Sequence, residues 1–147
     1  MTTFKDLDPL PYFDRWEESL RAIGWIGSRG DYSPGVTSEE FFLALVRLCA
    51  DPWQPVVSMG RQRCPLCRHT GGPAELSYGG MKVRLGSANV FVPTEQYVFV
   101  APTLVVHYID AHEYAPPEVF QQAVLSCPQM KSRAYLAEMK ARGLPVG

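Results

Sequence analysis

Residues 63–68 are Arg-Cys-Pro-Leu-Cys-Arg, and residues 106–112 are Val-His-Tyr-Ile-Asp-Ala-His. The first stretch holds a Cys-x-x-Cys pair, Cys64 and Cys67, and the second holds a His-x-x-x-x-His pair, His107 and His112. Two thiolates on a tight turn and two imidazoles supply four donors, the number that a tetrahedral structural Zn²⁺ site needs. The sequence therefore predicts a Cys2His2 zinc site with these four ligands.

The spacing of the two histidines makes a further prediction about their helix. Residues five apart on a regular helix point about 140° away from each other, so both rings cannot face one metal from an ideal helix. Residues 111–116 end in Pro116, where a helix is expected to stop. We therefore expect His107 to bind from a regular turn and His112 from the loosened helix end.

Other uses of these residues stay open at this stage. Cys64 and Cys67 could form a redox pair, although they do not precede a long helix in a strand-helix unit. His69 and Cys127 are rival ligands that could replace one histidine. Cys49 is expected on the apolar face of a helix, where a lone cysteine acts as a small hydrophobe. We leave Cys49 out of the site.

A catalytic role of the metal is the main alternative to a structural one. A catalytic zinc keeps an open position for water and a nearby carboxylate, and Asp110 and Glu113 lie beside the histidines. Four candidate ligands fill the shell, however, and two thiolates make the metal a poorer Lewis acid. We therefore favour a non-enzymatic protein with no catalytic residues, and we keep a metal-dependent hydrolase as the alternative.

The composition is that of one globular domain. The chain has 147 residues, 46% of them hydrophobic and 20% charged, which predicts a single domain over residues 1–147. No apolar run reaches the roughly 20 residues of a membrane span, and residues 1–9 carry acids where a signal peptide has bases. We expect a cytoplasmic protein with no membrane contact.

Turn signals and apolar periodicity predict an α+β fold. We expect a small antiparallel sheet of three or four strands between N-terminal and C-terminal helices, cross-linked by the zinc site. Residues 1–13, with Pro9 and Pro11, are expected to form an extended lead-in. The clearest helix has Thr37 at its N-cap and Glu40 as its capping-box partner.

The remaining elements follow from the same signals. Helices are expected at 14–23, 37–51, 102–112, 117–125 and 128–141, with the C-terminal stretch 128–147 prone to fraying. Strands are expected at 56–59, 74–78, 81–85, 88–93 and 96–100.

Partners are predicted only by class. A protein partner is favoured, because no catalytic set stands out. Nucleic acid is the less favoured alternative, since the net charge of the chain is close to zero, at −1. Those bases are Arg61, Arg63, Arg68, Lys82 and Arg84.

Several segments together resemble a family of small, uncharacterised bacterial proteins that carry a Cys-x-x-Cys and a His-x4-His. The resemblance covers nearly the whole chain and implies a cytoplasmic bacterial protein with one fold and no assigned reaction. The segments that carry it are Phe4-x-Asp6-Leu7, 12–13, 22–26, Gly35-x4-Glu40-Phe41, Pro52-Trp53-Gln54-Pro55 and 100–120.

Overall fold

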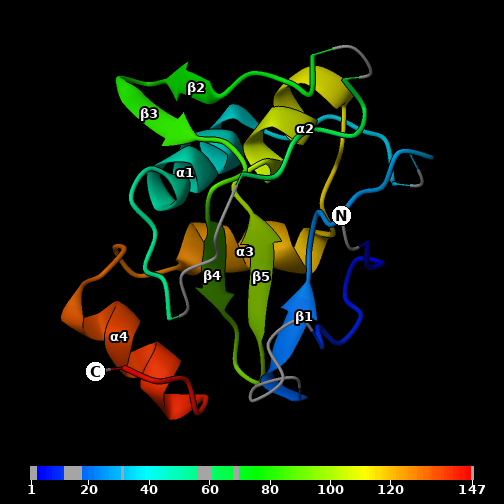
Figure 1. Cartoon of the computed structure of the whole chain (residues 1–147). Coiled ribbons are helices and arrows are strands. Elements are labelled where there is room, and N and C mark those ends of the chain that lie inside the picture. Colours follow the sequence, from blue (N-terminus) through cyan, green and yellow to red (C-terminus); the bar gives the residue numbers. More distant parts are fainter. Residues whose placement is uncertain (1–2, 12–17, 31, 56–60, 68–69, 147) are drawn as a thin grey trace.

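The protein is described here by a computed structural model, which covers residues 3–11, 18–30, 32–55, 61–67 and 70–146. Most strands and most helices form separate runs along the chain, with β2 to β5 in succession and then α2 to α4, so the predicted α+β class is confirmed (Figure 1). The elements are β1 (Leu20–Ala22), α1 (Glu39–Cys49), β2 (Glu75–Tyr78), β3 (Met81–Arg84), β4 (Asn89–Pro93), β5 (Val98–Pro102), α2 (Val105–His112), α3 (Glu118–Ser126) and α4 (Arg133–Ala141). The strand predicted at 56–59 lies outside the described residues.

The strands divide between two sheets, whereas the sequence predicted a single antiparallel one. β4 and β5 pair antiparallel, β1 joins β5 in parallel, and β2 and β3 form a separate hairpin. Burial explains the division. Every residue of β4 and β5 is buried, so these strands lie between two layers, whereas β2 and β3 alternate between buried and exposed positions. A half-exposed hairpin cannot continue a sheet that is covered on both faces.

The helix predicted at 14–23 is wrong over its second half. Residues 14–17 are not described, but Leu20–Ala22 form β1, whose residues face Val98–Val100 of β5. Leu20 and Ala22 are fully buried, while Arg21 between them lies over the Tyr97 ring. Tertiary pairing has therefore overridden a helical pattern. The lead-in hydrogen-bonds to β1 from the other side, through Leu10 N to Leu20 O and Ala22 N to Asp8 O.

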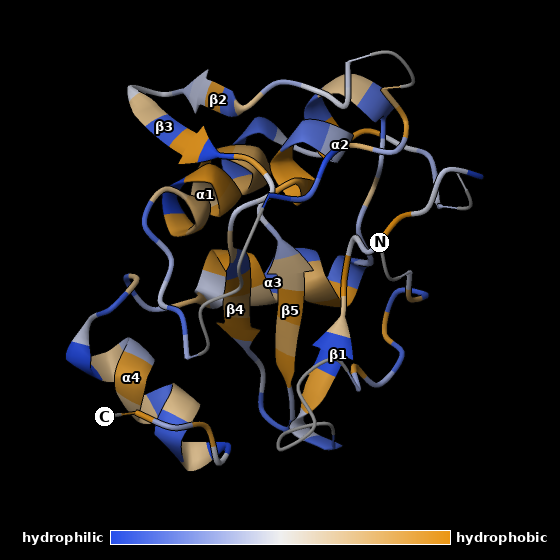
Figure 2. Ribbon diagram, in the orientation of Figure 1, coloured by the Kyte–Doolittle hydropathy of each residue, from blue (hydrophilic) through white to orange (hydrophobic). Residues whose placement is uncertain are grey.

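Each face of the three-stranded sheet carries its own core (Figures 1 and 2). Val90, Val92 and Phe99 pack into the cluster that contains the inner faces of α1, α2 and α3. Phe91 and Val100, which alternate with them, pack into the second cluster, together with residues of α4 and the lead-in. The sheet is therefore a central layer.

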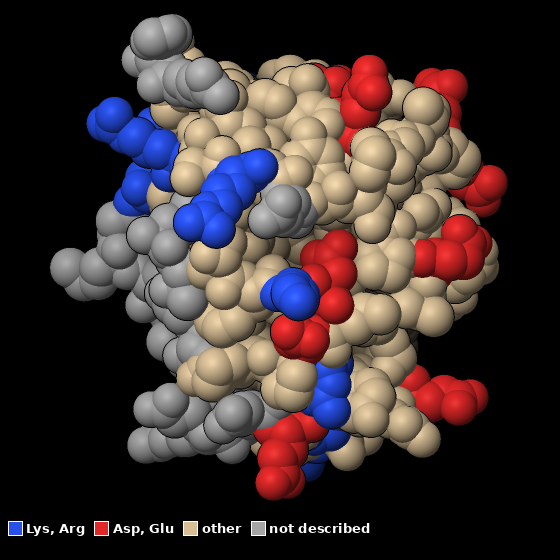
Figure 3. All heavy atoms as spheres, turned by 90° about the vertical axis from the view of Figure 1, so that its right-hand side faces the viewer, with Lys and Arg blue, Asp and Glu red and all other residues tan. Residues whose placement is uncertain are grey.

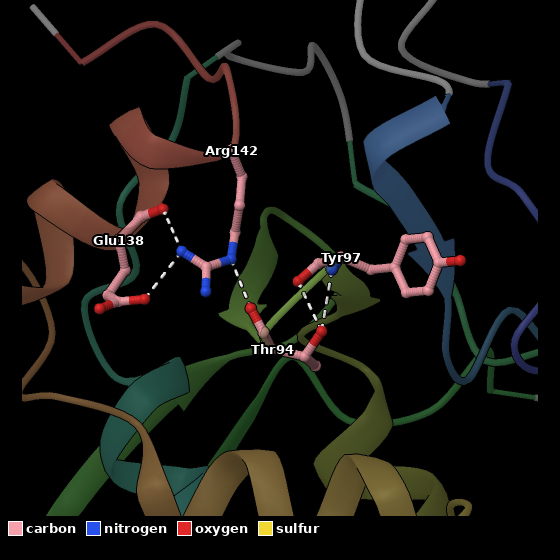
Figure 4. Close-up of polar contacts among 4 residues, drawn as sticks. All are labelled: Thr94, Tyr97, Glu138 and Arg142. Atoms are coloured by element: carbon pink, nitrogen blue, oxygen red, sulfur yellow. Dashed lines mark hydrogen bonds and ion pairs between the residues drawn. The ribbon is translucent and has the colours of Figure 1, made fainter.

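Helix α4 is anchored at both ends of its buried face. Tyr135 is fully buried and donates a hydrogen bond from its hydroxyl to Phe91 O. At the other end, Arg142 donates to Thr94 O in the β4–β5 turn and pairs with the Glu138 carboxylate at 2.7 Å (Figure 4). The turn itself is closed by the Thr94 hydroxyl, which accepts from Tyr97 N.

The outer edge of β4 is covered partly by a side chain. Gln54 donates from its amide nitrogen to Asn89 O at 2.6 Å and accepts from Asn89 N through its amide oxygen at 3.3 Å. The amide thereby makes the two backbone hydrogen bonds that a neighbouring strand would make. These bonds protect an edge that could otherwise pair with another chain. Across the described ranges, no helix has both the length and the apolar character to cross a membrane.

Candidate metal centre

The two cysteines lie on a turn that is closed by its own backbone. Cys64 N donates to Gly71 O at 2.7 Å, and Gly71 N donates to Cys67 O at 3.0 Å. A weaker bond of 3.4 Å joins Cys67 N to Cys64 O. These bonds fold the chain back on itself and hold both cysteines on one turn, as a metal-binding turn requires.

Helix α2 supplies the two histidines. It begins at Val105 rather than at the predicted Pro102, because Pro102 is the last residue of β5, opposite Asn89. A strand end tolerates proline, which has no N–H to donate. His107 lies in the first turn, with its N–H bonded to Leu104 O.

His112 is the last residue of α2, at the end where we expected it. Glu113 follows in the left-handed conformation, with φ of 53°, and its N–H bonds to Tyr108 O. This left-handed residue ends the helix directly after the second histidine. The imidazole rings of His107 and His112 are nearly perpendicular, at 88°, with their centroids 5.0 Å apart.

The four predicted ligands lie together. Their donor atoms are all within 4.8 Å of one another. Cys67 Sγ lies 3.3 Å from His107 Nε2 and 3.5 Å from His112 Nε2, and Cys64 Sγ lies 3.5 Å from His112 Nε2. Bonds of about 2.3 Å to sulfur and about 2.0 Å to nitrogen in a tetrahedron place S and N donors about 3.5 Å apart. The cluster therefore has the dimensions of a Cys2His2 metal site.

Burial sets the protonation of the site in the absence of a metal. Cys64 and His107 are almost fully buried, while Cys67 and His112 are half-buried. Burial raises the pKa of the Cys64 thiol, which favours its protonated form. Burial, and then the neighbouring His112, lowers the pKa of His107, which keeps that imidazole neutral and able to bind a metal. Metal binding at Cys64 would therefore release a proton.

Gly72 brings the backbone against the cluster. A Cβ atom at this position would lie 2.9 Å from Cys64 Cβ and 3.5 Å from His107 Nε2, and its φ of +84° is one that other residues rarely adopt. Only glycine fits both the space and the conformation. In the sequence, two successive glycines after the cysteines indicate only a loop, so this packing against the ligands could not be predicted from them.

The rival ligands lie elsewhere or outside the description. Cys127 caps the end of α3 and is not part of the ligand cluster. Cys49 is buried on the apolar face of α1, as predicted. His69 is not among the described residues. Within the described ranges, the group formed by Cys64, Cys67, His107 and His112 is the one whose donor atoms are close enough to share a metal ion.

The acidic residues considered for catalysis and the basic residues considered for nucleic-acid binding are not part of the ligand cluster. Asp110 and Glu113 are exposed and do not belong to the ligand cluster. Arg61 donates to the carbonyl oxygens of Leu85 and Pro73, and Lys82 pairs with Glu75. These two bases are thus engaged within the fold, while Arg68 lies outside the described residues.

Residues 2–125 match a protein family described as Domain of unknown function (DUF7919), and the chain belongs to this family. The match includes both the Cys-x-x-Cys and the His-x4-His. No curated protein and no solved structure is significantly similar to the chain.

Proposed function

We propose that this member of the DUF7919 family is a non-catalytic protein-binding module whose fold is closed by a structural Zn²⁺ ion. The ion is bound by Cys64, Cys67, His107 and His112. The observation that carries this proposal is the spacing of the donors, all within 4.8 Å of one another, with three of the sulfur to nitrogen distances at 3.3 to 3.5 Å. Such a sulfur and nitrogen donor set favours Zn²⁺ over Mg²⁺ or Ca²⁺, which prefer oxygen.

The position of the site in the chain supports a structural role. Cys67 and His107 bracket the segment that contains β2, β3, β4 and β5. Closing a loop of about 40 residues stabilises the native state by about 4 kcal/mol through the lost entropy of the unfolded chain, by the relation used for disulfides. The ion would therefore cross-link the cysteine turn to α2, and we call this cross-link the zinc clasp.

The donor set also supports a structural rather than a hydrolytic metal. Four protein ligands occupy all the positions of a tetrahedron, so none is left for a water nucleophile. Asp110 and Glu113 are exposed, and we interpret them as surface acids rather than as catalytic residues. A cysteine-based site of this kind is suited to the reducing cytoplasm, where disulfides are rare.

Metal analysis of the purified full chain tests this proposal. We expect about one zinc per chain, and a chelator should lower the free energy of unfolding by about 4 kcal/mol or more. Cys64→Ser and His107→Ala should lose the zinc, whereas Cys127→Ser should keep it, because Cys127 lies outside the cluster. A metal-free protein whose melting temperature does not respond to chelator would overturn the zinc clasp.

A further inference from the structure

A surface groove of about 420 Å³ lies beside the C-terminal turn of α2. One wall is the segment 35–38 with the start of α1, and the other is formed by Ile109, Asp110 and Glu113. Phe42 and Tyr78 complete the lining, and their rings meet edge to face with the centroids 4.9 Å apart. We call this feature the acidic groove.

The acidic groove exposes apolar surface. Val36 is 92% exposed, so almost none of its side chain is covered by the rest of the chain. Together with the partly exposed Tyr78 and Ile109 it offers a contact surface for an aliphatic or aromatic group, to which the largely buried Phe42 adds little. Single exposed apolar residues are ordinary on protein surfaces, but here the exposed valine borders a groove with further apolar lining.

The rim of the groove is negatively charged. Glu39, Asp110 and Glu113 are all exposed, and no Lys or Arg is among the described residues that line the groove. One oxygen of Glu39 accepts a hydrogen bond from the Tyr78 hydroxyl at 3.1 Å. The ion pairs found among the described residues involve Glu75, Asp51 and Glu138 instead. The carboxylates of Glu39, Asp110 and Glu113 are therefore not neutralised by a Lys or Arg side chain among the described residues.

On the face shown in Figure 3, the right-hand side carries acidic side chains and no Lys or Arg, whereas the centre and the bottom carry charges of both signs and the upper left carries Lys and Arg. A surface of one sign attracts partners of the opposite sign and repels those of the same sign.

Two of these acids occupy positions that oppose local stability. Asp110 lies in the last turn of α2 and Glu113 at its C-cap, where the helix dipole is negative and acidic side chains are unfavourable. Glu113 also has a positive φ of 53°, which glycine or asparagine adopts more easily. Positions that break local rules without a visible structural gain are typical of functional sites.

The groove is also held in shape. Gly35 N donates to Glu113 O at 2.8 Å, and Ala115 N donates to Ser33 O at 3.0 Å. The Tyr32 hydroxyl donates to His112 O at 2.7 Å. Both walls are thereby joined to each other and to the end of the metal-binding helix, so a ligand would meet a preformed surface, which lowers the entropy cost of binding.

We propose that the acidic groove binds a segment of a partner protein that carries Lys or Arg next to an apolar side chain. The cationic group lies against Asp110 and Glu113, and the apolar group lies against Val36. This inference rests on the proposed function, since it names the partner class of the same module. A metal ion is the weaker occupant, because these carboxylates do not form a cluster close enough to share one ion among the described residues.

Titration of the zinc-loaded, ¹⁵N-labelled full chain with a short synthetic peptide of alternating lysine and leucine tests the proposal. We expect amide shifts to change at Val36, Glu39, Tyr78 and around Asp110. A peptide of alternating glutamate and leucine should leave them unchanged, and one of lysine and glycine should bind more weakly. Raising the salt concentration should weaken binding, because exposed charges are screened.

Matched variants locate the effect. Asp110→Asn with Glu113→Gln should weaken the binding of the lysine-leucine peptide about five- to tenfold, while the melting temperature stays the same or rises because two acids leave the helix end. Glu95→Gln with Glu118→Gln removes the same charge from exposed acids outside the groove and should leave the affinity unchanged. Val36→Ser should weaken binding without affecting the fold.

The groove proposal would be overturned if the lysine-leucine peptide caused no shifts, if the shifts lay outside the groove, or if the two double variants weakened binding equally. Equal shifts with CaCl₂ alone would replace the peptide by a metal ion and also overturn it. Zinc content is measured on the same samples. Loss of the zinc clasp would therefore be seen separately from failure of the groove to bind.

Discussion

Replacing Gly72 by alanine tests the packing of the metal centre most directly. The new methyl group would lie 2.9 Å from Cys64 Cβ and 3.5 Å from His107 Nε2. Gly80 provides a matched control, because its φ of +78° is close to the +84° of Gly72, but a Cβ there meets nothing within 4 Å. Both variants carry a similar backbone cost, about 1–2 kcal/mol for a left-handed alanine. Only Gly72→Ala adds a steric conflict at the ligands.

The difference between the two variants isolates that conflict. Overpacking costs about 1–3 kcal/mol, so Gly72→Ala should be less stable than Gly80→Ala by that amount in urea unfolding of the zinc-loaded protein. Displaced ligands should also lower the zinc affinity by about 10- to 100-fold, the range seen when groups that orient metal ligands are changed. Competition with a chromophoric chelator measures this affinity. If the two variants unfold alike and bind zinc equally, the close approach of Gly72 to the ligands is refuted.

Three other predictions concern buried polar groups. Tyr108→Phe should be neutral or stabilising, because the buried Tyr108 hydroxyl has no hydrogen-bond partner among the described residues, whereas Tyr135→Phe should cost about 1 kcal/mol for its lost bond to Phe91 O; equal effects in thermal unfolding would contradict this. Gln54→Ala should destabilise by about 1–3 kcal/mol and increase aggregation measured by light scattering, since two bonds to Asn89 are lost at a sheet edge; an unchanged protein would argue against the edge cover. Burial raises the pKa of Asp6, despite hydrogen bonds from Gly24 N and the Tyr114 hydroxyl. Protonated Asp6 therefore stabilises the fold at low pH, and this contribution is lost as the pH rises through the folded pKa. Between the ordinary pKa of Asp6 in the unfolded chain and its raised pKa in the fold, the free energy of unfolding of the natural protein relative to Asp6→Asn should fall by at most about 1.4 kcal/mol per pH unit. A relative stability that rises with pH in this range would contradict the prediction.

The ligand cluster illustrates how far local sequence can determine a site. Cys64 and Cys67 are neighbours on a turn, and His107 and His112 share one short helix, so each pair could be recognised from spacing alone. The helix end at His112 was also predictable, because Pro116 and Pro117 follow it. The approach of Gly72 was not, since nothing in a Gly-Gly pair shows which side chains will face it.

The strands show the limit of the same reasoning. Four of the strands were found from apolar runs and turns, because periodicity and turn residues are local properties. Their division between two sheets depends on which runs become buried on both faces, and this is decided by the helices that cover β4 and β5. Leu20–Ala22 has a helical pattern but forms a strand, because the edge of β5 was available for pairing.

By itself, then, the sequence determined the four side chains of the candidate metal site, the α+β class and most helices, all of which follow from spacing, periodicity and turn chemistry over short distances. Tertiary structure alone decided the pairing of β1 with β5 and the closeness of Gly72 to the ligands. It also decided that the end of α2, the start of α1 and Tyr78 form one acidic groove. The physical reason is that these features join residues far apart in the chain. Their contacts depend on how whole layers pack, and no local pattern records that packing.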